Sequence, residues 1–150
     1  MWRQPSFMEL ALKEAHAAAG RGETPVGAVV VREGVVIGAA GNRVREDDDP
    51  TGHAEILAIR QACAALGQSR LDGADLYVTL EPCAMCAGAI AHARIRRLYY
   101  GAPDPKGGGV DHGPRLFTQP TCLHRPEVYG GLDERRCAAV LKDFFAALRD

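Results

Sequence analysis

The chain has 150 residues, of which 47% are hydrophobic and 25% are charged, and its formal net charge is −1. This composition is typical of a soluble globular protein that is long enough to bury a core. No apolar run approaches the ~20 residues that cross a bilayer, and the N-terminus lacks the order of a signal peptide, so we expect a cytoplasmic protein without a membrane partner.

The hydrophobic pattern predicts helices that alternate with strands after an initial hairpin. Ser6 and Glu9 fit a capping box for the first helix, and Thr51 is the expected N-cap of the second. The expected helices are 7–20, 53–67, 83–93 and a last one capped by Asp133, and the expected strands are 26–31, 35–42, 74–80, 95–101 and 126–131. This order predicts an α/β fold, a three-layer α/β/α sandwich around a mixed, roughly five-stranded sheet, in a single domain over residues 1–150.

Several side chains away from the ends of the predicted elements are expected to have structural roles only. Cys63 and Cys137 are interpreted as core packing and His16 as a surface histidine. The last helix has apolar residues at helical spacing, which predicts a buried stripe; they are Val140, Leu141, Phe144, Phe145 and Leu148. The loop-rich stretch 102–125 is long, and loops of that length are usually functional.

Cys83 and Cys86 open a predicted helix directly after Pro82. At positions i and i+3 their sulfurs share one helix face, and the positive N-terminal end of the helix favours thiolates. His53 opens another predicted helix, and two helix N-termini at the same end of a sheet can bring three ligands together. Three ligands and an open fourth position are typical of catalytic zinc.

Two other interpretations of these residues remain open at this point. A Cys-x-x-Cys pair taken alone also fits a thioredoxin-like redox site. A structural zinc requires a fourth ligand, and the chain offers four candidates, which are His92, His112, Cys122 and His124.

The joint pattern favours catalysis. His53-Ala54-Glu55 is followed, after 26 residues, by "PCAMC" at 82–86. The order H-x-E…P-C-x-x-C is the signature of zinc-dependent nucleobase deaminases. Each half of the signature opens a predicted helix, as that site requires.

The chain resembles the bacterial tRNA-specific adenosine deaminases of the TadA type, which have the cytidine-deaminase-like fold. The resemblance covers almost the whole length, and the stretches that carry it are 23–31, 41–43, 49–62, 76–90, 93–108 and 143–149. The stretch 110–131 departs from the family pattern, since Leu123 precedes His124 where an asparagine often stands.

The resemblance implies hydrolytic deamination of adenosine to inosine at the wobble position of a tRNA anticodon loop. It implies one Zn²⁺ per chain, with His53, Cys83 and Cys86 as ligands. Glu55 is then the proton shuttle that serves the ring nitrogen and the departing ammonia. Glu81, beside Pro82, is the second carboxylate considered for this task, and the family pattern favours Glu55.

The resemblance also implies contacts to the substrate. Asn42 matches a family asparagine that hydrogen-bonds the base, although it also suits a turn, and the Ala54 N–H is a second contact. Asp104 and Lys106 match a family loop near the RNA, and Arg94 begins a basic stretch that suits phosphates. The partners implied are a tRNA anticodon stem-loop and a second copy of the chain in a homodimer.

Two rival functions follow from the same residues. The first is a deaminase of a free nucleobase or nucleoside of the guanine or cytosine type, which would share the zinc and Glu55. The second is a structural-zinc interaction module without catalysis, which would need a fourth ligand and would tolerate substitution of Glu55.

Overall fold

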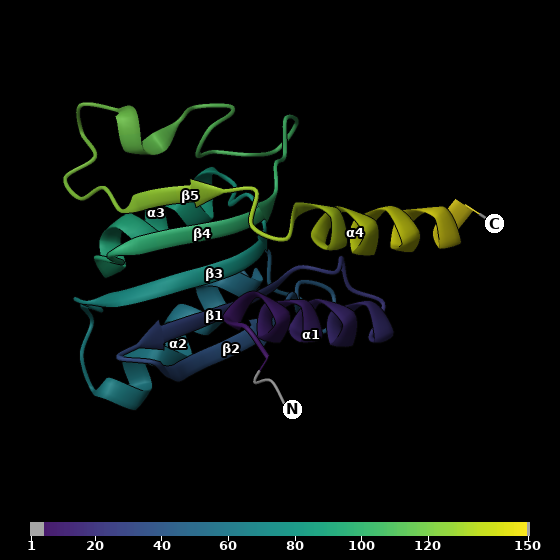
Figure 1. Cartoon of the computed structure of the whole chain (residues 1–150), viewed down its shortest axis with the longest axis horizontal. Helices are drawn as coiled ribbons and strands as arrows, with labels where there is room; N and C mark the ends of the chain where they lie inside the picture. Colours follow the sequence, from purple (N-terminus) through teal and green to yellow (C-terminus); the bar gives the residue numbers. More distant parts are fainter. Residues whose placement is uncertain (1–4, 150) are drawn as a thin grey trace.

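The computed structural model describes residues 5–149, and in this range five strands alternate with four helices (Figure 1). The strands are β1 (Gly27–Arg32), β2 (Val35–Gly41), β3 (Ala74–Leu80), β4 (Arg97–Ala102) and β5 (Glu127–Gly130). The helices are α1 (Phe7–Gly20), α2 (Ala54–Leu66), α3 (Ala84–Ala93) and α4 (Glu134–Arg149), with a short 3₁₀ helix η1 (Leu116–Thr118). Every predicted element is present, with ends shifted by at most two residues.

The strands form one mixed sheet in the order β2-β1-β3-β4-β5. Strand β1 is antiparallel to β2 and β3, whereas β3, β4 and β5 run parallel. Helices α1 and α4 cover one face of the sheet, and α2 and α3 cover the other (Figure 1). The predicted three-layer α/β/α sandwich is confirmed.

Strand β1 separates the two halves of the core, because its successive side chains point to opposite faces. Ala28 and Val30 pack in the larger cluster with α2 and α3, while Val29 and Val31 pack in the smaller cluster with α1. Since both faces are covered, the strand is apolar at almost every position, which explains why its sequence is a continuous apolar run.

Helix α2 lies unusually close to the sheet. A Cβ atom on Gly38 of β2 would lie only 2.2 Å from the carbonyl oxygen of Ala58. The side of α2 that meets the sheet carries small side chains, including Ala58 and Ala62, both fully buried. This close contact fixes the position of α2 and therefore of the residues at its start.

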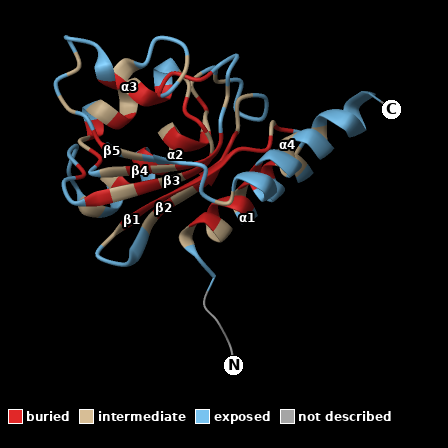
Figure 2. Ribbon diagram, turned by 45° about the horizontal axis from the view of Figure 1, so that its top comes forward, coloured by how far each residue is buried: buried red, intermediate tan, exposed pale blue. Residues whose placement is uncertain are grey.

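The predicted buried stripe of α4 is wrong. Within α4 only Cys137 is buried, as predicted, and Phe145 and Leu148 are 44% and 66% exposed. The remaining stripe residues are half-buried, namely Val140, Leu141 and Phe144. The physical reason is that α4 meets the sheet only through its first turns and then projects beyond it (Figure 2).

Local predictions agree with the structure in other places. The Ser6 hydroxyl accepts the Glu9 N–H at 3.1 Å and caps α1. His16 is exposed, and Cys63 is half-buried against the larger core cluster. Within residues 5–149, none of the helices combines the length and the apolar character that crossing a membrane requires.

Candidate active site

The N-terminal ends of α2 and α3 meet at one end of the sheet. His53 is the N-cap of α2 and Cys83 is the N-cap of α3, and neither side chain makes a capping hydrogen bond. The prediction of Thr51 as the cap is therefore wrong: its N–H and hydroxyl both donate to the carboxylate of Asp49. An N-cap side chain normally bonds its own helix, so both caps are left for another task.

The side chains of His53, Cys83 and Cys86 converge between the two helices. Nδ1 of His53 lies 3.6 Å from Sγ of Cys83 and 3.5 Å from Sγ of Cys86. Zinc bonds of about 2.3 Å to sulfur and about 2.0 Å to nitrogen, at the tetrahedral angle, place the two ligand atoms about 3.5 Å apart. The three residues thus have the spacing that a tetrahedral metal ion requires. Among the described residues, this is the one group of three or more His, Cys, Asp or Glu side chains that could hold a metal ion.

The four candidates for a further metal ligand are engaged elsewhere or lie apart. Nδ1 of His112 contacts Glu81 at 2.7 Å, the Cys122 thiol donates to the His124 carbonyl, and Nε2 of His124 contacts the Ile95 carbonyl. His92 lines a different pocket. Within residues 5–149, a four-ligand structural site therefore has no support.

Electrostatics prepare the two sulfurs for a cation. Hydrogen bonds with Cys86 and His53 lower the pKa of Cys83 to about 4, against the opposing effect of burial. The hydrogen bond to Cys83 and burial raise the pKa of Cys86. The low pKa of Cys83 favours its thiolate, the form in which a cysteine binds a metal ion. The described cysteines form no disulfide.

Glu55 lies in the first turn of α2, two residues after His53, and is 4% exposed. Burial raises the pKa of its carboxyl group to about 7. A carboxyl group with this pKa both accepts and donates protons at neutral pH, which is the property of a general acid–base catalyst. The structure thus places a carboxyl group with this property two residues from His53, next to the three residues that could hold a metal ion.

Asn42 and Ala54, the two predicted base contacts, are bonded to each other. Oδ1 of Asn42 accepts the Ala54 N–H at 2.8 Å and so supplies the cap that His53 does not. Arg21 at the end of α1 donates to the Asn42 carbonyl at 3.1 Å, which fixes the backbone there. The amide oxygen is thereby occupied, and the Nδ2 group is the part of Asn42 available to a ligand.

A pocket of about 450 Å³, a typical size for a small-ligand site, lies at this end of the sheet. Its walls hold most of the predicted site residues, which are Asn42, His53, Glu55, Cys83 and Asp104. Lys106 is exposed on the loop beside it. Arg94 is not part of this pocket, since it ends α3 and lines a second pocket of about 320 Å³.

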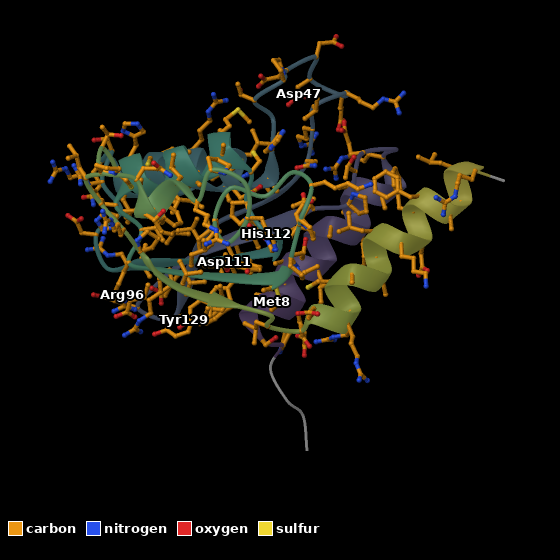
Figure 3. All side chains as sticks on the ribbon, turned by 90° about the horizontal axis from the view of Figure 1, so that it is seen from above. Met8, Asp47, Arg96, Asp111, His112 and Tyr129 are labelled. Atoms are coloured by element: carbon orange, nitrogen blue, oxygen red, sulfur yellow. The ribbon has the colours of Figure 1, made fainter. Side chains whose placement is uncertain are left out.

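The rest of the basic stretch lies at the other end of the sheet. Arg97 begins β4, level with Asp75 of β3, whereas the metal-ligand group follows the end of β3. Arg96 pairs with Asp75 and Arg97 pairs with Glu127, each at 2.9 Å. Figure 3 shows Arg96 towards the left of the molecule, apart from His112. Of the three arginines in this stretch, Arg96 and Arg97 are therefore each paired with a neighbouring carboxylate.

Sequence reasoning missed two kinds of pocket residue. Glu23, 2% exposed, accepts the N–H groups of Arg45 and Glu46 and holds that loop against the pocket. The α4 side chains Phe144, Phe145 and Leu148 line the pocket instead of the core. The signal for Glu23 was a carboxylate four residues before the start of the buried strand β1. The α4 pattern contained no signal to separate core from pocket.

Comparisons with known proteins agree with this geometry. The family model described as MafB19-like deaminase matches residues 3–149. A protein of Agrobacterium fabrum named tRNA-specific adenosine deaminase is 62% identical and covers 99% of this chain and 98% of its own. A chain from a structural study of A-to-I editing by tRNA:A34 deaminases at the wobble position is 65% identical, with a TM-score of 0.89, covering 90% of this chain and 98% of that one. A guanine deaminase from Bacillus subtilis is 32% identical, with a TM-score of 0.66, covering 99% and 96%.

The geometry predicts that metal binding depends on each of the two sulfurs. Cys83→Ala should reduce bound zinc to well below one ion per chain and lower the thermal midpoint, because metal binding contributes to folding. Mass spectrometry of the purified protein measures the metal content. Cys63→Ala, a change of the same kind outside the site, is the control and should retain the metal. Full zinc content in both Cys83→Ala and Cys86→Ala would contradict the assignment.

Proposed function

The chain belongs to the MafB19-like deaminase family, and on this basis we propose that it is a hydrolase that deaminates adenosine to inosine at the wobble position of a tRNA anticodon loop. The observation that carries the proposal is the His53–Cys83–Cys86 group beside a buried Glu55 whose pKa is about 7. We also propose that it acts in the cytoplasm, where tRNA is found, and that residues 1–150 form a single catalytic domain.

The proposed cofactor is one Zn²⁺ per chain, held by His53, Cys83 and Cys86. Zinc with three protein ligands supplies a Lewis acid that makes water nucleophilic near neutral pH. The chain contributes the ligand spacing and a thiolate that exists before the metal arrives. The two helix N-termini add a positive field that favours anionic ligands.

Glu55 carries the protons in the proposed reaction. Water adds through its oxygen to C6 of the adenine ring, the bond from C6 to the exocyclic nitrogen breaks, and ammonia leaves. Glu55 takes a proton from the attacking water and delivers it to the ring nitrogen. It then takes the remaining proton from the new hydroxyl group at C6 and transfers it to the leaving amine as the C6 carbonyl forms. Its burial favours both transfers, because a pKa of about 7 lets the same group accept and release protons.

Asn42 is proposed to orient the base. Its Oδ1 is held by the Ala54 N–H, so the side chain presents Nδ2 as a donor to an acceptor atom of a purine. The Ala54 N–H is the second proposed contact, and it would have to be shared between Asn42 and the base. This arrangement fixes the amide orientation without any help from the substrate.

The RNA on either side of the target base is proposed to meet the rim of the pocket. Asp104 lies in the pocket wall, and Lys106 is exposed next to it. A loop adenosine is partly unstacked, so flipping it into the pocket costs only a few kcal/mol. Arg94 lies in the second pocket, so we propose that it reaches the RNA bound by a partner subunit.

A homodimer through α3 is the proposed active unit. The sequence of α3, AMCAGAIAHA, carries no Asp, Glu, Lys or Arg, and a helix that is apolar all round is normally buried on all sides. One side packs in the core, but Met85 is 38% exposed, and the groove beside α3 holds Leu123, which is 87% exposed. A second copy related by a two-fold axis would cover both Met85 and Leu123, and it would then lie next to the proposed metal ligands.

The first rival, a free guanine deaminase, keeps the same metal group and glutamate. The guanine deaminase relative is only 32% identical, whereas the two relatives named for tRNA adenosine are 62% and 65% identical. The higher identity extends over 90% or more of the chain in both cases, which favours RNA.

Removal of the proton carrier should abolish turnover and leave the metal in place. Glu55→Ala is expected to lower kcat by at least ~10²–10⁴-fold, because one residue serves several proton transfers. Steady-state assays with saturating substrate measure kcat, and metal analysis checks the site. Glu33→Ala removes an exposed carboxylate from the turn between β1 and β2 and should have no effect. A Glu55→Ala rate within tenfold of the parent would assign the proton transfers to another group.

The substrate proposal is tested by competition. A stem-loop with adenosine at the wobble position should be deaminated in preference to free adenosine, guanine, cytosine and cytidine at equal concentration. Inosine formation is measured by chromatography after nuclease digestion. Affinity for the stem-loop should fall as salt rises, because phosphate contacts release counterions. Turnover of a free base without turnover of the stem-loop would replace the RNA proposal by the small-molecule alternative.

The dimer proposal is tested by light scattering after size exclusion. The zinc-loaded protein is expected to have twice the mass of one chain. Met85→Glu should shift the mass towards one chain, because it places a charge in the proposed contact. Val35→Glu, at an apolar position that is 60% exposed on β2, is the matched control and should leave the mass unchanged. A parent protein with the mass of one chain at micromolar concentration would exclude the dimer.

A further inference from the structure

Glu81, immediately before the Pro82-Cys83 step, has a carboxylate that the proposed chemistry does not use. It is 1% exposed and sits between the end of β3 and the loop 104–112. Its Oε1 accepts the Asp104 N–H at 3.0 Å and contacts Nδ1 of His112 at 2.7 Å. Because an ionised carboxylate only accepts hydrogen bonds, this nitrogen of His112 carries the proton.

The other oxygen of the same carboxylate is used more heavily. Oε2 accepts three consecutive peptide N–H groups, from Val110, Asp111 and His112, at 3.2, 3.0 and 3.1 Å. Four peptide N–H groups and the His112 ring thus surround one buried carboxylate, which is the arrangement of an ionised carboxylate that only accepts hydrogen bonds. Both oxygens of Glu81 therefore accept hydrogen bonds from the loop, which leaves neither for proton transfer to a substrate.

The loop is packed tightly around this anion. A Cβ atom on Gly108 would lie 2.4 Å from Oε2 of Glu81, and one on Gly109 would lie 2.6 Å from the Ala84 nitrogen at the start of α3. The Gly109 N–H donates to the Pro82 carbonyl at 2.8 Å. Both ends of the loop are thus tied to one side chain, and its middle is tied to the segment that carries Cys83.

The same loop forms part of the pocket wall. Asp104 and Gly107 line the pocket, and the Asp104 carboxylate accepts the Gly107 N–H at 2.9 Å, which makes a tight turn with Lys106 exposed on it. His112 and Asp111 lie side by side at the other end of the loop (Figure 3). Removing the anchor would free Asp104 and Lys106 to move relative to the metal ligands.

We propose that Glu81 is a positioning residue, a buried anion that holds the loop 104–112 so that Asp104 and Lys106 meet the RNA flanking the target base. This inference rests on the proposed function for the identity of the substrate, but the anchoring itself does not depend on it. Glu81 acts on binding of the RNA and leaves the chemical step to Glu55.

Glu81→Gln tests the anchor with almost no change of shape. Either orientation of the new amide turns its NH₂ group towards a peptide N–H, of Asp104 on one side or of 110–112 on the other. Two donors then face each other, and the loop loses its charged acceptor. His112→Ala is a milder variant, because it removes one contact and keeps the peptide hydrogen bonds. Glu33→Gln is the control, the same chemical change at an exposed turn.

Amide hydrogen exchange reads the anchor without any substrate. In the zinc-loaded parent, the N–H groups of Asp104, Val110, Asp111 and His112 should exchange slowly. In Glu81→Gln they should exchange at least tenfold faster, while α1 and β1 keep their parent rates. His112→Ala should give a smaller change and Glu33→Gln none. Unchanged exchange of the loop in Glu81→Gln would overturn the anchoring.

Kinetics then test whether the anchor serves RNA binding. For the wobble stem-loop, Glu81→Gln should raise KM at least tenfold with kcat within threefold of the parent and with full zinc content. Asp104→Ala should raise KM as well. The KM of the double variant should not exceed that of the more impaired single variant, because both changes act through one contact. A fall in kcat with unchanged KM, or additive effects, would overturn the positioning role. A parent that ignores the stem-loop refutes the proposed function and the RNA role together, while the exchange result still decides the anchoring.

Discussion

The convergence of two helix N-termini is the constraint on which the rest of the structure depends. Helices α2 and α3 begin at His53 and Cys83, and the side chains of both N-caps turn away from their own helices and towards each other. Their unpaired N–H groups and dipoles favour an anion or thiolate at this point. The cost of leaving a cap unused at α2 is offset by Asn42, whose side chain accepts the Ala54 N–H in its place. The close approach of α2 to Gly38 then fixes where this end lies.

Two buried carboxylates give the pocket its walls. Glu23 binds the peptide N–H groups of the 43–49 loop, and Glu81 binds those of the 104–112 loop. A pocket with several acidic residues would repel a polyanion if their charges were free. Here the two carboxylates are nearly inaccessible and their charge is satisfied by backbone donors, so they act as rigid anchors and leave the rim to other residues.

The C-terminal helix shows how one sequence pattern serves two environments. The apolar spacing in α4 is that of a helix packed on a core, and its first turns do pack there through Cys137. Past that point the helix leaves the sheet, and Phe144, Phe145 and Leu148 line the pocket instead (Figure 2). A periodic apolar stripe indicates that one face of a helix is covered, but it does not distinguish a face that packs on the protein core from one that lines a ligand pocket.

The sequence by itself determined what depends on neighbours along the chain. The periods of the helices and strands, the Ser6 cap and the spacing of the His53–Glu55 and Cys83–Cys86 pairs are all local. Together they predicted the sandwich and the composition of the candidate site. The tertiary structure alone decided the cap of α2, the direction of α4 and the tasks of Glu23 and Glu81. Each of these rests on hydrogen bonds or packing between residues that are distant in sequence, such as the 23 to 31 positions that separate Glu81 from its donors. A buried carboxylate has the same sequence signature as a catalytic one, and only the donors that surround it in space distinguish an anchor from a proton carrier.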